Sequence, residues 1–229
     1  MYWMNSTINC NKQLKLLWND GIVLLLLQRR LSSSIEAIYL SLKRRRERLQ
    51  VLLDKTMEER KRMIAAMENG NFDDYEDMSY QEQENAEDLA ESATGSLDID
   101  ELRTEIQVLE ALILQAEMLK YSTVERKYEE LEKTIFSPDG LLHRGEKFLI
   151  FTESVDTLLY LEEKLRVRIS GIAKITGIYS IDERRRQVEL FQNQYSIMLA
   201  TDAGGESINL QFCNQMINYD IPWNPNKLE

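Results

Sequence analysis

The stretch that decides the fold is residues 198–229, which read MLATDAGGESINLQFCNQMINYDIPWNPNKLE. An apolar strand is expected over 197–200. It runs into Thr201, a Gly204-Gly205 pair follows, and a second strand is expected over 215–219. A strand followed by a glycine turn and the start of a helix presents backbone N–H groups to a phosphate in parallel α/β sheets. The stretch therefore predicts an α/β fold with a ligand-binding edge.

The same alternation of strands and helices extends back to about residue 144. The helix after the strand expected over 172–176 is opened by Ser180-Ile-Asp-Glu183, a capping box in which Ser180 is the N-cap. Strands that alternate with helices predict a parallel sheet with right-handed crossovers. We therefore expect an α/β lobe over 144–229 with at least four parallel strands, at 147–151, 172–176, 197–200 and 215–219, and with helices at 155–166 and from 181 to about 192.

Residues 22–136 have a helical period. Apolar residues recur at three- and four-residue steps from Leu24 to Leu52 and again from Leu102 to Val124. They predict one helix that continues to about residue 67 and another from about 96 to near 136. Ser32-Ser33-Ser34 followed by Glu36 indicates a break and a new N-cap in the first. We expect the two to form a long α-helical hairpin inserted in, or leading into, the lobe. Residues 1–21 have no clear period and are expected to be irregular.

The charge is unevenly distributed along the chain. The net charge of the 229 residues is −11. Thirteen acidic and no basic residues lie between Met63 and Leu102, which leaves 26 acidic and 28 basic residues elsewhere, a net charge of +2. We expect an acidic loop at 68–101. Local patches, rather than the net charge, should decide which partners bind.

Cysteine usage and hydropathy indicate a cytoplasmic chain. Cys10 and Cys213 are far apart and have no metal-ligand spacing, so no metal site is expected, and Cys213 is expected to be a buried thiol. The apolar run over 22–27 is far shorter than the about 20 residues that a membrane span needs. No small-residue cleavage site follows it, so we expect neither a signal peptide nor contact with a membrane.

Several stretches resemble motifs of superfamily 2 helicases and translocases. Residues 201–209 and the run NYDIPWNP over 218–225 resemble motif V, and the segment after it, in the second RecA-like lobe of that superfamily. Within that superfamily, these residues resemble Swi/Snf-like bacterial ATPases of the RapA type. Residues 148–154 resemble motif IV, residues 175–191 resemble the next block, and residues 27–45 resemble a helical block that the RapA-like group carries ahead of this lobe. The resemblance implies a RecA-like sheet of the P-loop NTPase type, here incomplete, and an activity that couples ATP hydrolysis to movement on nucleic acid.

The resemblance also implies roles for particular residues. Thr201 would contact a nucleic-acid phosphate, and Asn209 would lie near the nucleotide ribose. The alternative is a set of strand ends and helix caps with no ligand, and for the basic helix a solvated charged face. The expected nucleic-acid contacts are Thr152, Gly177, Thr201, Lys43, Arg44 and Arg45, and the expected nucleotide contacts are Gly205, Glu206, Ser207 and Asn209.

The parts that would make such an enzyme active are missing from the sequence. It has no P-loop and no convincing Asp-Glu metal box, and it ends where the family would next place Gln-Arg-x-Gly-Arg-x-x-Arg. Gly140-x4-Gly145-Glu146-Lys147 has only the spacing of a P-loop, because the lysine does not follow the second glycine directly. His143 has no triad partner and is expected in a loop. The chain therefore looks like a fragment without catalytic residues, inactive alone.

Three hypotheses stay open from the sequence. The chain could be part of an ATP-dependent helicase or translocase, with ATP and Mg²⁺ as cofactors of the complete enzyme and a first RecA-like lobe supplied elsewhere. It could be a lone lobe that weakly binds nucleic acid, with DNA favoured, through the phosphate backbone. It could also be an interaction protein in which the helical hairpin docks a partner and the lobe is a degenerate scaffold.

Overall fold

The computed structural model describes residues 23–67, 98–122, 124–201 and 209–220. The chain divides into two compact units. We call Met1–Leu31 with Ile38–Met118 the helical unit, and Ser32–Ala37 with Leu119–Glu229 the α/β unit. The α/β unit thus begins earlier than the expected boundary at residue 144 and includes a short segment from far upstream.

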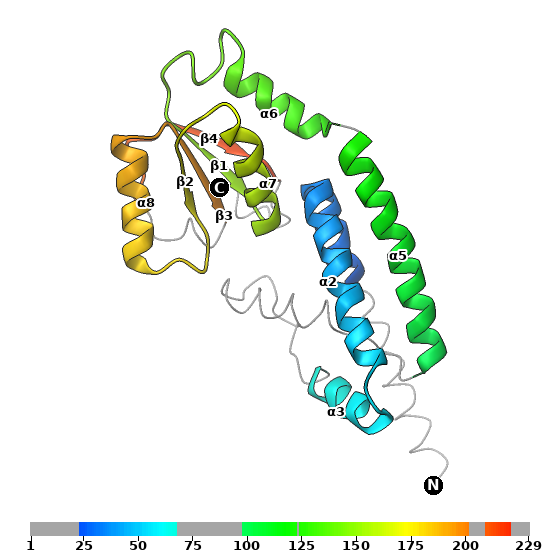
Figure 1. The fold of residues 1–229 in the computed structure, drawn as a ribbon. Coiled ribbons are helices and arrows are strands. Elements are labelled where there is room, and N and C mark those ends of the chain that lie inside the picture. The colour runs from blue at the N-terminus through cyan, green and yellow to red at the C-terminus, as the bar shows by residue number, and fades with distance from the viewer. Residues whose placement is uncertain (1–22, 68–97, 123, 202–208, 221–229) are drawn as a thin grey trace, which may run out of the picture. The chain divides into compact units, whose positions relative to one another are not determined.

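The helices of the described chain before the sheet are separate segments (Figure 1). A helix over 23–33 is followed by α2 (Ile35–Leu53) and α3 (Met57–Met67). Later come α5 (Ile99–Ser122) and α6 (Arg126–Phe136). No described helix is long and apolar enough to cross a lipid bilayer.

Helices α2 and α5 pack antiparallel in the helical unit, as the expected hairpin requires. Tyr39, early in α2, donates to Glu117, late in α5, at 3.4 Å, whereas Arg45, later in α2, pairs with Glu105, early in α5. Apolar side chains fill the space between the two helices. The buried members of this core are Ile38, Leu42, Leu49, Leu52, Leu102, Ile106, Leu109 and Ala116.

One helix break was expected in the first helical stretch, and two are found. The break at the serines is confirmed, because α2 begins at Ile35 and the Ser34 hydroxyl accepts the Ala37 N–H at 3.0 Å. The expectation of a continuous helix from there to residue 67 is wrong. Thr56 and Glu59 form a reciprocal capping box, with Thr56 Oγ1 accepting from Glu59 N at 3.3 Å and Glu59 Oε2 accepting from Thr56 N at 2.9 Å.

The second expected helix, over 96–136, is also two helices. It divides between α5 and α6, and Val124, expected on the buried face, lies in the break with 64% of its surface exposed. Leu112 and Leu119 of the same expected face are also exposed. The buried residues of α6, which are Tyr128, Leu131 and Ile135, pack into the core of the α/β unit.

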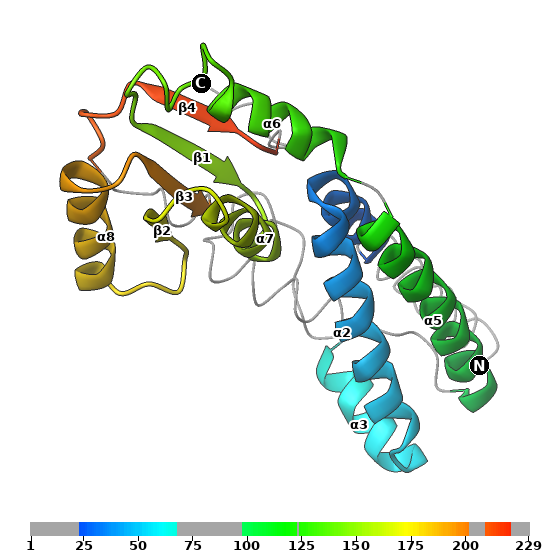
Figure 2. The same cartoon turned by 45° about the horizontal axis from the view of Figure 1, so that its top comes forward.

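In the described residues of the α/β unit, four parallel strands form the sheet, in line with the expected minimum of four (Figure 2). The order is β2-β3-β1-β4, and every pairing is parallel. The crossovers contain α7 (Val155–Arg166) and α8 (Ile181–Asn193), and Ser180 caps α8 by accepting the Glu183 N–H at 3.3 Å. The strands are β1 (Phe148–Thr152), β2 (Ile172–Ile175), β3 (Ile197–Thr201) and β4 (Gln215–Asn218).

Both faces of the sheet are covered by helices, because successive side chains of a strand point to opposite faces. On one face, Phe148 and Ile150 of β1 pack with α6 and α7. On the other, Leu149 of β1 packs with Phe191 of α8. Strands buried on both faces read as continuous apolar runs, which is why the sequence pattern located them well.

The stretch with P-loop-like spacing has a structural role. Gly145 adopts a φ of 70°, in the region that favours glycine, and ends the exposed turn that contains His143. Lys147 then donates to the backbone oxygens of Phe191 and Tyr195 at 2.8 and 2.7 Å. Its ammonium thereby satisfies carbonyls at the end of α8, where a cation is favoured.

Candidate functional site

A row of hydroxyl groups lies at the carboxyl edge of the sheet. Thr152 and Thr201 are paired in register at the ends of β1 and β3. Thr176 is one residue beyond Ile175, which pairs with Ala200, so it lies beside Thr201. Tyr219 follows Asn218, which pairs with Phe151, so it lies beside Thr152. We call these four the hydroxyl row. Ligands of open parallel sheets bind at this edge.

Asp220 holds one end of the hydroxyl row. Its Oδ2 accepts from Thr152 Oγ1 at 2.5 Å, from Glu153 N at 3.0 Å and from Ser33 Oγ at 2.8 Å. Its Oδ1 accepts from Lys127 Nζ at 2.6 Å. The residue is only 8% exposed, and a buried carboxylate is tolerated when it is paired with a cation and its oxygens accept hydrogen bonds.

Ser33 and Ser34, at the break before α2, belong to the group of residues that surrounds Asp220. The hydroxyls of Ser33 and Ser34 lie 2.6 and 2.8 Å from Thr157 Oγ1 in the first turn of α7. Lys127 Nζ donates to the Ser33 carbonyl at 3.1 Å and sits 4.2 Å from the centre of the Tyr219 ring. Residues 32–37 are therefore built into the α/β unit. The sequence pattern indicates only a helix break at the serines, and it contains no signal for the roles of Asp220 and Lys127.

The other hydroxyls of this edge, that of Tyr219 included, have no partner in the described part of the chain. Within the described part of the chain, Thr176 Oγ1, Thr201 Oγ1 and Ser154 Oγ are buried and make no hydrogen bond. Ser154 is the N-cap residue of α7, but its side chain makes no cap hydrogen bond. Buried polar groups normally have partners, so each such group calls for an explanation.

Gly177 lies in a turn that Arg184 fixes. The Tyr179 N–H donates to the Thr176 carbonyl at 3.2 Å. Arg184 of α8 donates from Nε to the Tyr179 carbonyl and from Nη2 to the Gly177 carbonyl, each at 3.1 Å. A guanidinium that holds two carbonyls of one turn restrains the backbone and places a positive charge beside it.

The basic residues of α2 differ from one another in their surroundings. Arg45 is 5% exposed and donates from Nε and Nη2 to Glu105 Oε1 at 3.0 and 2.5 Å, which makes it part of the helix packing. Lys43 and Arg44 are half-buried. Lys43 lies 5.2 Å from the Tyr39 ring centre, and Arg44 donates to Ser41 Oγ at 3.1 Å. Of the three expected contacts in this helix, Lys43 and Arg44 therefore keep solvated surface and Arg45 does not.

Most of the expected nucleotide contacts lie outside the described residues. Gly205, Glu206 and Ser207 are among these. Asn209 is described and exposed, and its Oδ1 accepts the Gln211 N–H at 3.2 Å. The amide nitrogen of Asn209 remains a donor of the kind that a ribose hydroxyl can accept from.

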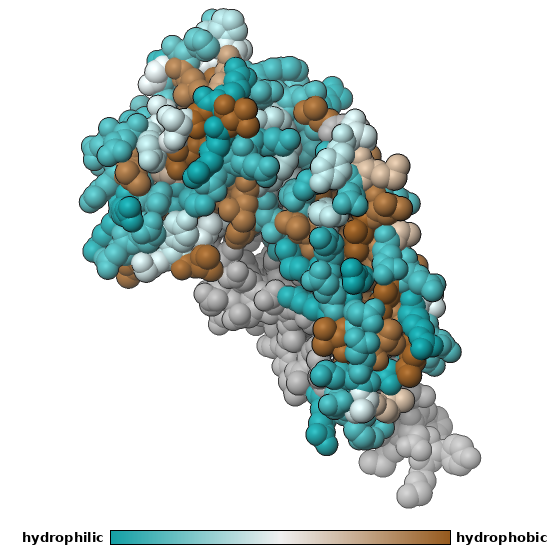
Figure 3. All heavy atoms as spheres, viewed as in Figure 1, coloured by the Kyte–Doolittle hydropathy of each residue, from teal (hydrophilic) through white to brown (hydrophobic). Residues whose placement is uncertain are grey.

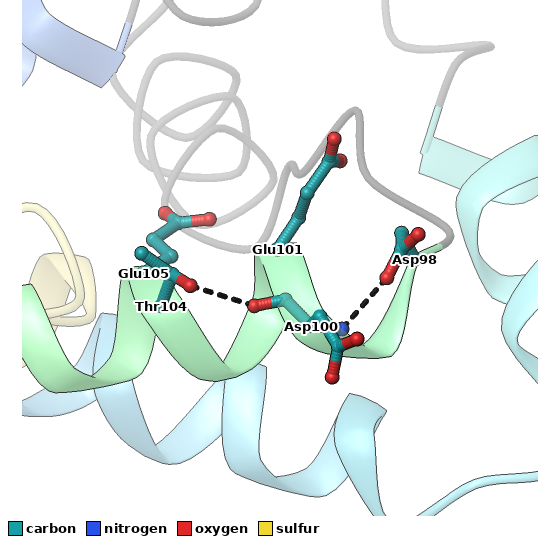
Figure 4. Close-up of a pocket in the computed structure, with 5 residues that line it drawn as sticks. All are labelled: Asp98, Asp100, Glu101, Thr104 and Glu105. Carbon is teal, nitrogen blue, oxygen red and sulfur yellow. Dashed lines mark hydrogen bonds between the residues drawn. The ribbon is translucent and has the colours of Figure 1, made fainter.

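A hollow of about 450 Å³ lies at the start of α5 (Figure 4). There Asp100 N donates to Asp98 Oδ1, and Thr104 Oγ1 donates to the Asp100 carbonyl, each at 2.7 Å. The lining is acidic, so this hollow repels phosphates. No group of three metal-ligating side chains occurs in the described ranges. The lining residues are Asp98, Asp100, Glu101, Thr104 and Glu105.

The comparison with protein families defines the class to which this sheet belongs. Residues 126–229, a little under half of the chain, match the helicase conserved C-terminal domain, and the parallel sheet in this part of the chain has the RecA-like fold of that domain. The match begins at α6, in agreement with the packing of that helix into the α/β core. The matching relatives include RapA and Swi/Snf-like remodelling proteins of superfamily 2, so the expected resemblance is confirmed.

The individual relatives are larger proteins. The chain is 43% identical over 84 residues to the uncharacterized ATP-dependent helicase YqhH of Bacillus subtilis, which covers 37% of this chain and 15% of that protein. It is 35% identical to the RNA polymerase-associated protein RapA of Vibrio parahaemolyticus, over 38% of this chain and 9% of RapA. It is 36% identical to the human chromatin-remodeling ATPase INO80, over 40% of this chain and 6% of INO80.

Among solved structures, the C-terminal part of the Fun30 ATPase domain aligns with 94% of this chain and 73% of its own chain. The sequence identity is 20% and the TM-score is 0.38.

Proposed function

We propose that this chain supplies the second RecA-like motor lobe of an ATP-dependent helicase or translocase, and that the hydroxyl row faces the nucleic-acid backbone. The observation that carries the proposal is the Thr201 hydroxyl, which is fully buried at the carboxyl edge of the sheet without a partner in the described chain. The helicase C-terminal match over 126–229 and the named ATP-dependent helicase among the relatives support it.

The chemistry at this edge suits phosphate oxygens. Hydroxyls and backbone N–H groups donate to phosphates without reading bases, so binding should be independent of sequence. Thr201 and the turn at Gly177 would supply such contacts, and Lys43 and Arg44 would add positive charge along a strand. Thr152 would act indirectly, since its hydroxyl already donates to Asp220.

ATP and Mg²⁺ would bind to the complete motor rather than to this chain alone. Gly205, Glu206, Ser207 and Asn209 would meet the nucleotide from this side, and a first lobe with a P-loop would hold the phosphates and the metal ion. ATP hydrolysis supplies the free energy for movement. Because this sequence contains no P-loop and no convincing Asp-Glu box, we expect no ATP turnover above buffer background from the chain by itself.

The test is a fluorescence anisotropy titration with labelled single-stranded and double-stranded DNA and RNA at two salt concentrations. We expect weak binding that falls steeply as salt rises, because each phosphate contact releases counterions. Thr201→Val should weaken binding. Thr134→Val is the matched control, because Thr134 is exposed on α6 and its hydroxyl donates only to the Glu130 carbonyl. Binding that ignores salt or depends on base sequence would contradict the proposal.

A non-catalytic interaction module is the second candidate, and the surface of α5 favours it. Val108, Leu114 and Met118 are 55%, 58% and 63% exposed, and apolar side chains are visible along this helix in Figure 3. Exposed apolar groups that gather on one element are typical of interaction surfaces. Mixing the chain with a P-loop-containing first lobe discriminates the two candidates. DNA-stimulated ATP hydrolysis supports the motor, and binding without hydrolysis supports the module.

A further inference from the structure

Among the four members of the hydroxyl row, Thr152 has a hydrogen-bond partner in the described chain, whereas Thr176, Thr201 and, at the other end of the row, Tyr219 have none. Thr152 donates to Asp220 at 2.5 Å and so serves the fold. Thr176 and Thr201 are 4% and 0% exposed, and neither hydroxyl has a partner among the residues that the structure describes. Such an arrangement lowers stability, because each hydroxyl has lost water without gaining a protein acceptor.

The two unbonded threonines lie next to each other on one face of the sheet. The pairing of Ile175 with Ala200 places Thr176 and Thr201 side by side, and neighbouring strands are about 4.8 Å apart. Residues two apart in a strand share a face, so Thr201 points to the same side as Leu199, toward the α7 face. Thr176 is four positions after Ile172 and so points to the same face, on which Ile172 packs.

The region around this pair suits an anion. Ser154, with another unbonded hydroxyl, is the N-cap residue of the twelve-residue helix α7 but makes no cap hydrogen bond, and the first turn of this helix also carries Asp156. A helix N-terminus carries partial positive charge and free N–H groups. Arg184 adds a full positive charge at the turn that follows Thr176.

We propose that Thr176 is a second phosphate-contacting residue, which donates its hydroxyl to the same nucleic-acid phosphate as Thr201, whereas Thr152 is a positioning residue that acts through Asp220. This inference rests on the proposed function and adds to it a hydroxyl that the sequence pattern did not single out. Phosphate oxygens are the acceptors that the two hydroxyls lack, and one phosphate offers more than one of them. Both hydroxyls are covered in the free chain, so binding must be accompanied by a local opening at this edge.

The test compares Thr176→Val with Thr176→Ser in the full chain. Valine has the shape of threonine without its hydroxyl, whereas serine keeps the hydroxyl. We expect Thr176→Val to weaken binding of a labelled oligonucleotide about 10-fold at low salt, as for the loss of one hydrogen bond to a charged group. The thermal midpoint of Thr176→Val should stay the same or rise, because an unbonded hydroxyl is removed. Thr176→Ser should bind within about twofold of the wild-type chain, as should the control Thr134→Val.

The outcomes separate this inference from the proposed function. If Thr201→Val weakens binding while Thr176→Val binds like the wild-type chain, the inference is overturned and the proposed function stands. If Thr176→Val lowers the thermal midpoint and loses binding only in proportion to the unfolded fraction, Thr176 is structural and the inference again fails. If the wild-type chain binds no nucleic acid at all at low salt, the inference on Thr176 and the proposed function are both contradicted.

Discussion

At the scale of single residues, the carboxylate of Asp220 connects parts of the α/β unit that are far apart in sequence. Its four donors come from the serine break, from the start of α6 and from the end of β1. One buried carboxylate thus fixes where β1 and β4 end relative to Ser33. The Thr152 hydroxyl donates its proton to Asp220 and has none left for a ligand. Thr201 and Thr176 are therefore the threonines that could donate to a ligand.

The first prediction concerns the loss of this carboxylate. Asp220→Ala should lower the free energy of unfolding by about 3–5 kcal/mol, because it leaves the Lys127 ammonium and several buried donors without their acceptor. Urea unfolding followed by circular dichroism measures the change. Glu163→Ala is the control, because Glu163 is exposed on α7, and it should stay within about 0.5 kcal/mol of the wild-type chain. A similar small effect for Asp220→Ala would show that the cluster contributes little to folding.

The second prediction concerns alkaline pH and Tyr219. Burial, followed by the nearby Glu125 carboxylate, raises the pKa of the Tyr219 hydroxyl well above its ordinary value of 10.0. A folded pKa above the unfolded one stabilises the fold below pH 10, and this contribution is lost as pH rises beyond it. Tyr219→Phe should therefore reduce the loss of stability between pH 8 and pH 11, measured by urea unfolding at each pH. Burial raises the pKa of Tyr160 as well, so part of the loss should remain.

At the scale of elements, the strands and the helices between them were predictable because their signals are local. A run such as 148–151 is apolar throughout, and α7 begins and ends where its period does. The second break in the first helical stretch was missed although Thr56 and Glu59 have capping-box spacing. The contact of Ser33 with Asp220 could not be predicted, since it joins residues 187 positions apart and depends on the finished fold.

The third prediction concerns this overlooked capping box. Thr56→Ala should destabilise the start of α3 by about 0.5–2 kcal/mol, because an N-cap hydroxyl satisfies a free N–H of the first turn. Hydrogen exchange of the α3 amides measures the effect locally. Since the two side chains cap each other's backbone, Thr56→Ala and Glu59→Ala should not be additive when combined. Additive losses would mean that the two bonds form independently.

The capping box also has a pH dependence with a definite sign. Hydrogen bonds from the Thr56 backbone N–H and then its hydroxyl lower the pKa of Glu59. A lowered pKa stabilises the folded state above the unfolded pKa, and the contribution is lost as pH falls through the folded value. Exchange protection at the start of α3 should therefore weaken in acid below about pH 4.5, and Glu59→Gln should remove that dependence.

At the scale of the whole molecule, the charge is unevenly distributed along the chain. Ten acidic and no basic residues fall within 68–97, so the sequence without this segment would have a net charge of −1 in place of −11. A segment of one sign influences charged partners over about a Debye length, roughly 10 Å at 0.1 M salt and farther at lower salt. The acidic segment should therefore oppose the approach of phosphates to the chain.

The last prediction follows from this opposition and rests on the proposed function. Replacing the ten acidic residues within 68–97 by Asn and Gln keeps the length of the chain and removes the charge. We expect this variant to bind a labelled oligonucleotide more tightly than the wild-type chain at 50 mM salt, and the two affinities to converge as salt rises, because the repulsion is screened. Anisotropy titrations at several salt concentrations measure both. A variant with four exposed lysines or arginines of 61–62 and 185–186 replaced by Gln serves as the opposite control and should bind more weakly. Equal affinities of the neutralised and wild-type chains at every salt concentration would show that the acidic segment does not act on nucleic acid through its charge.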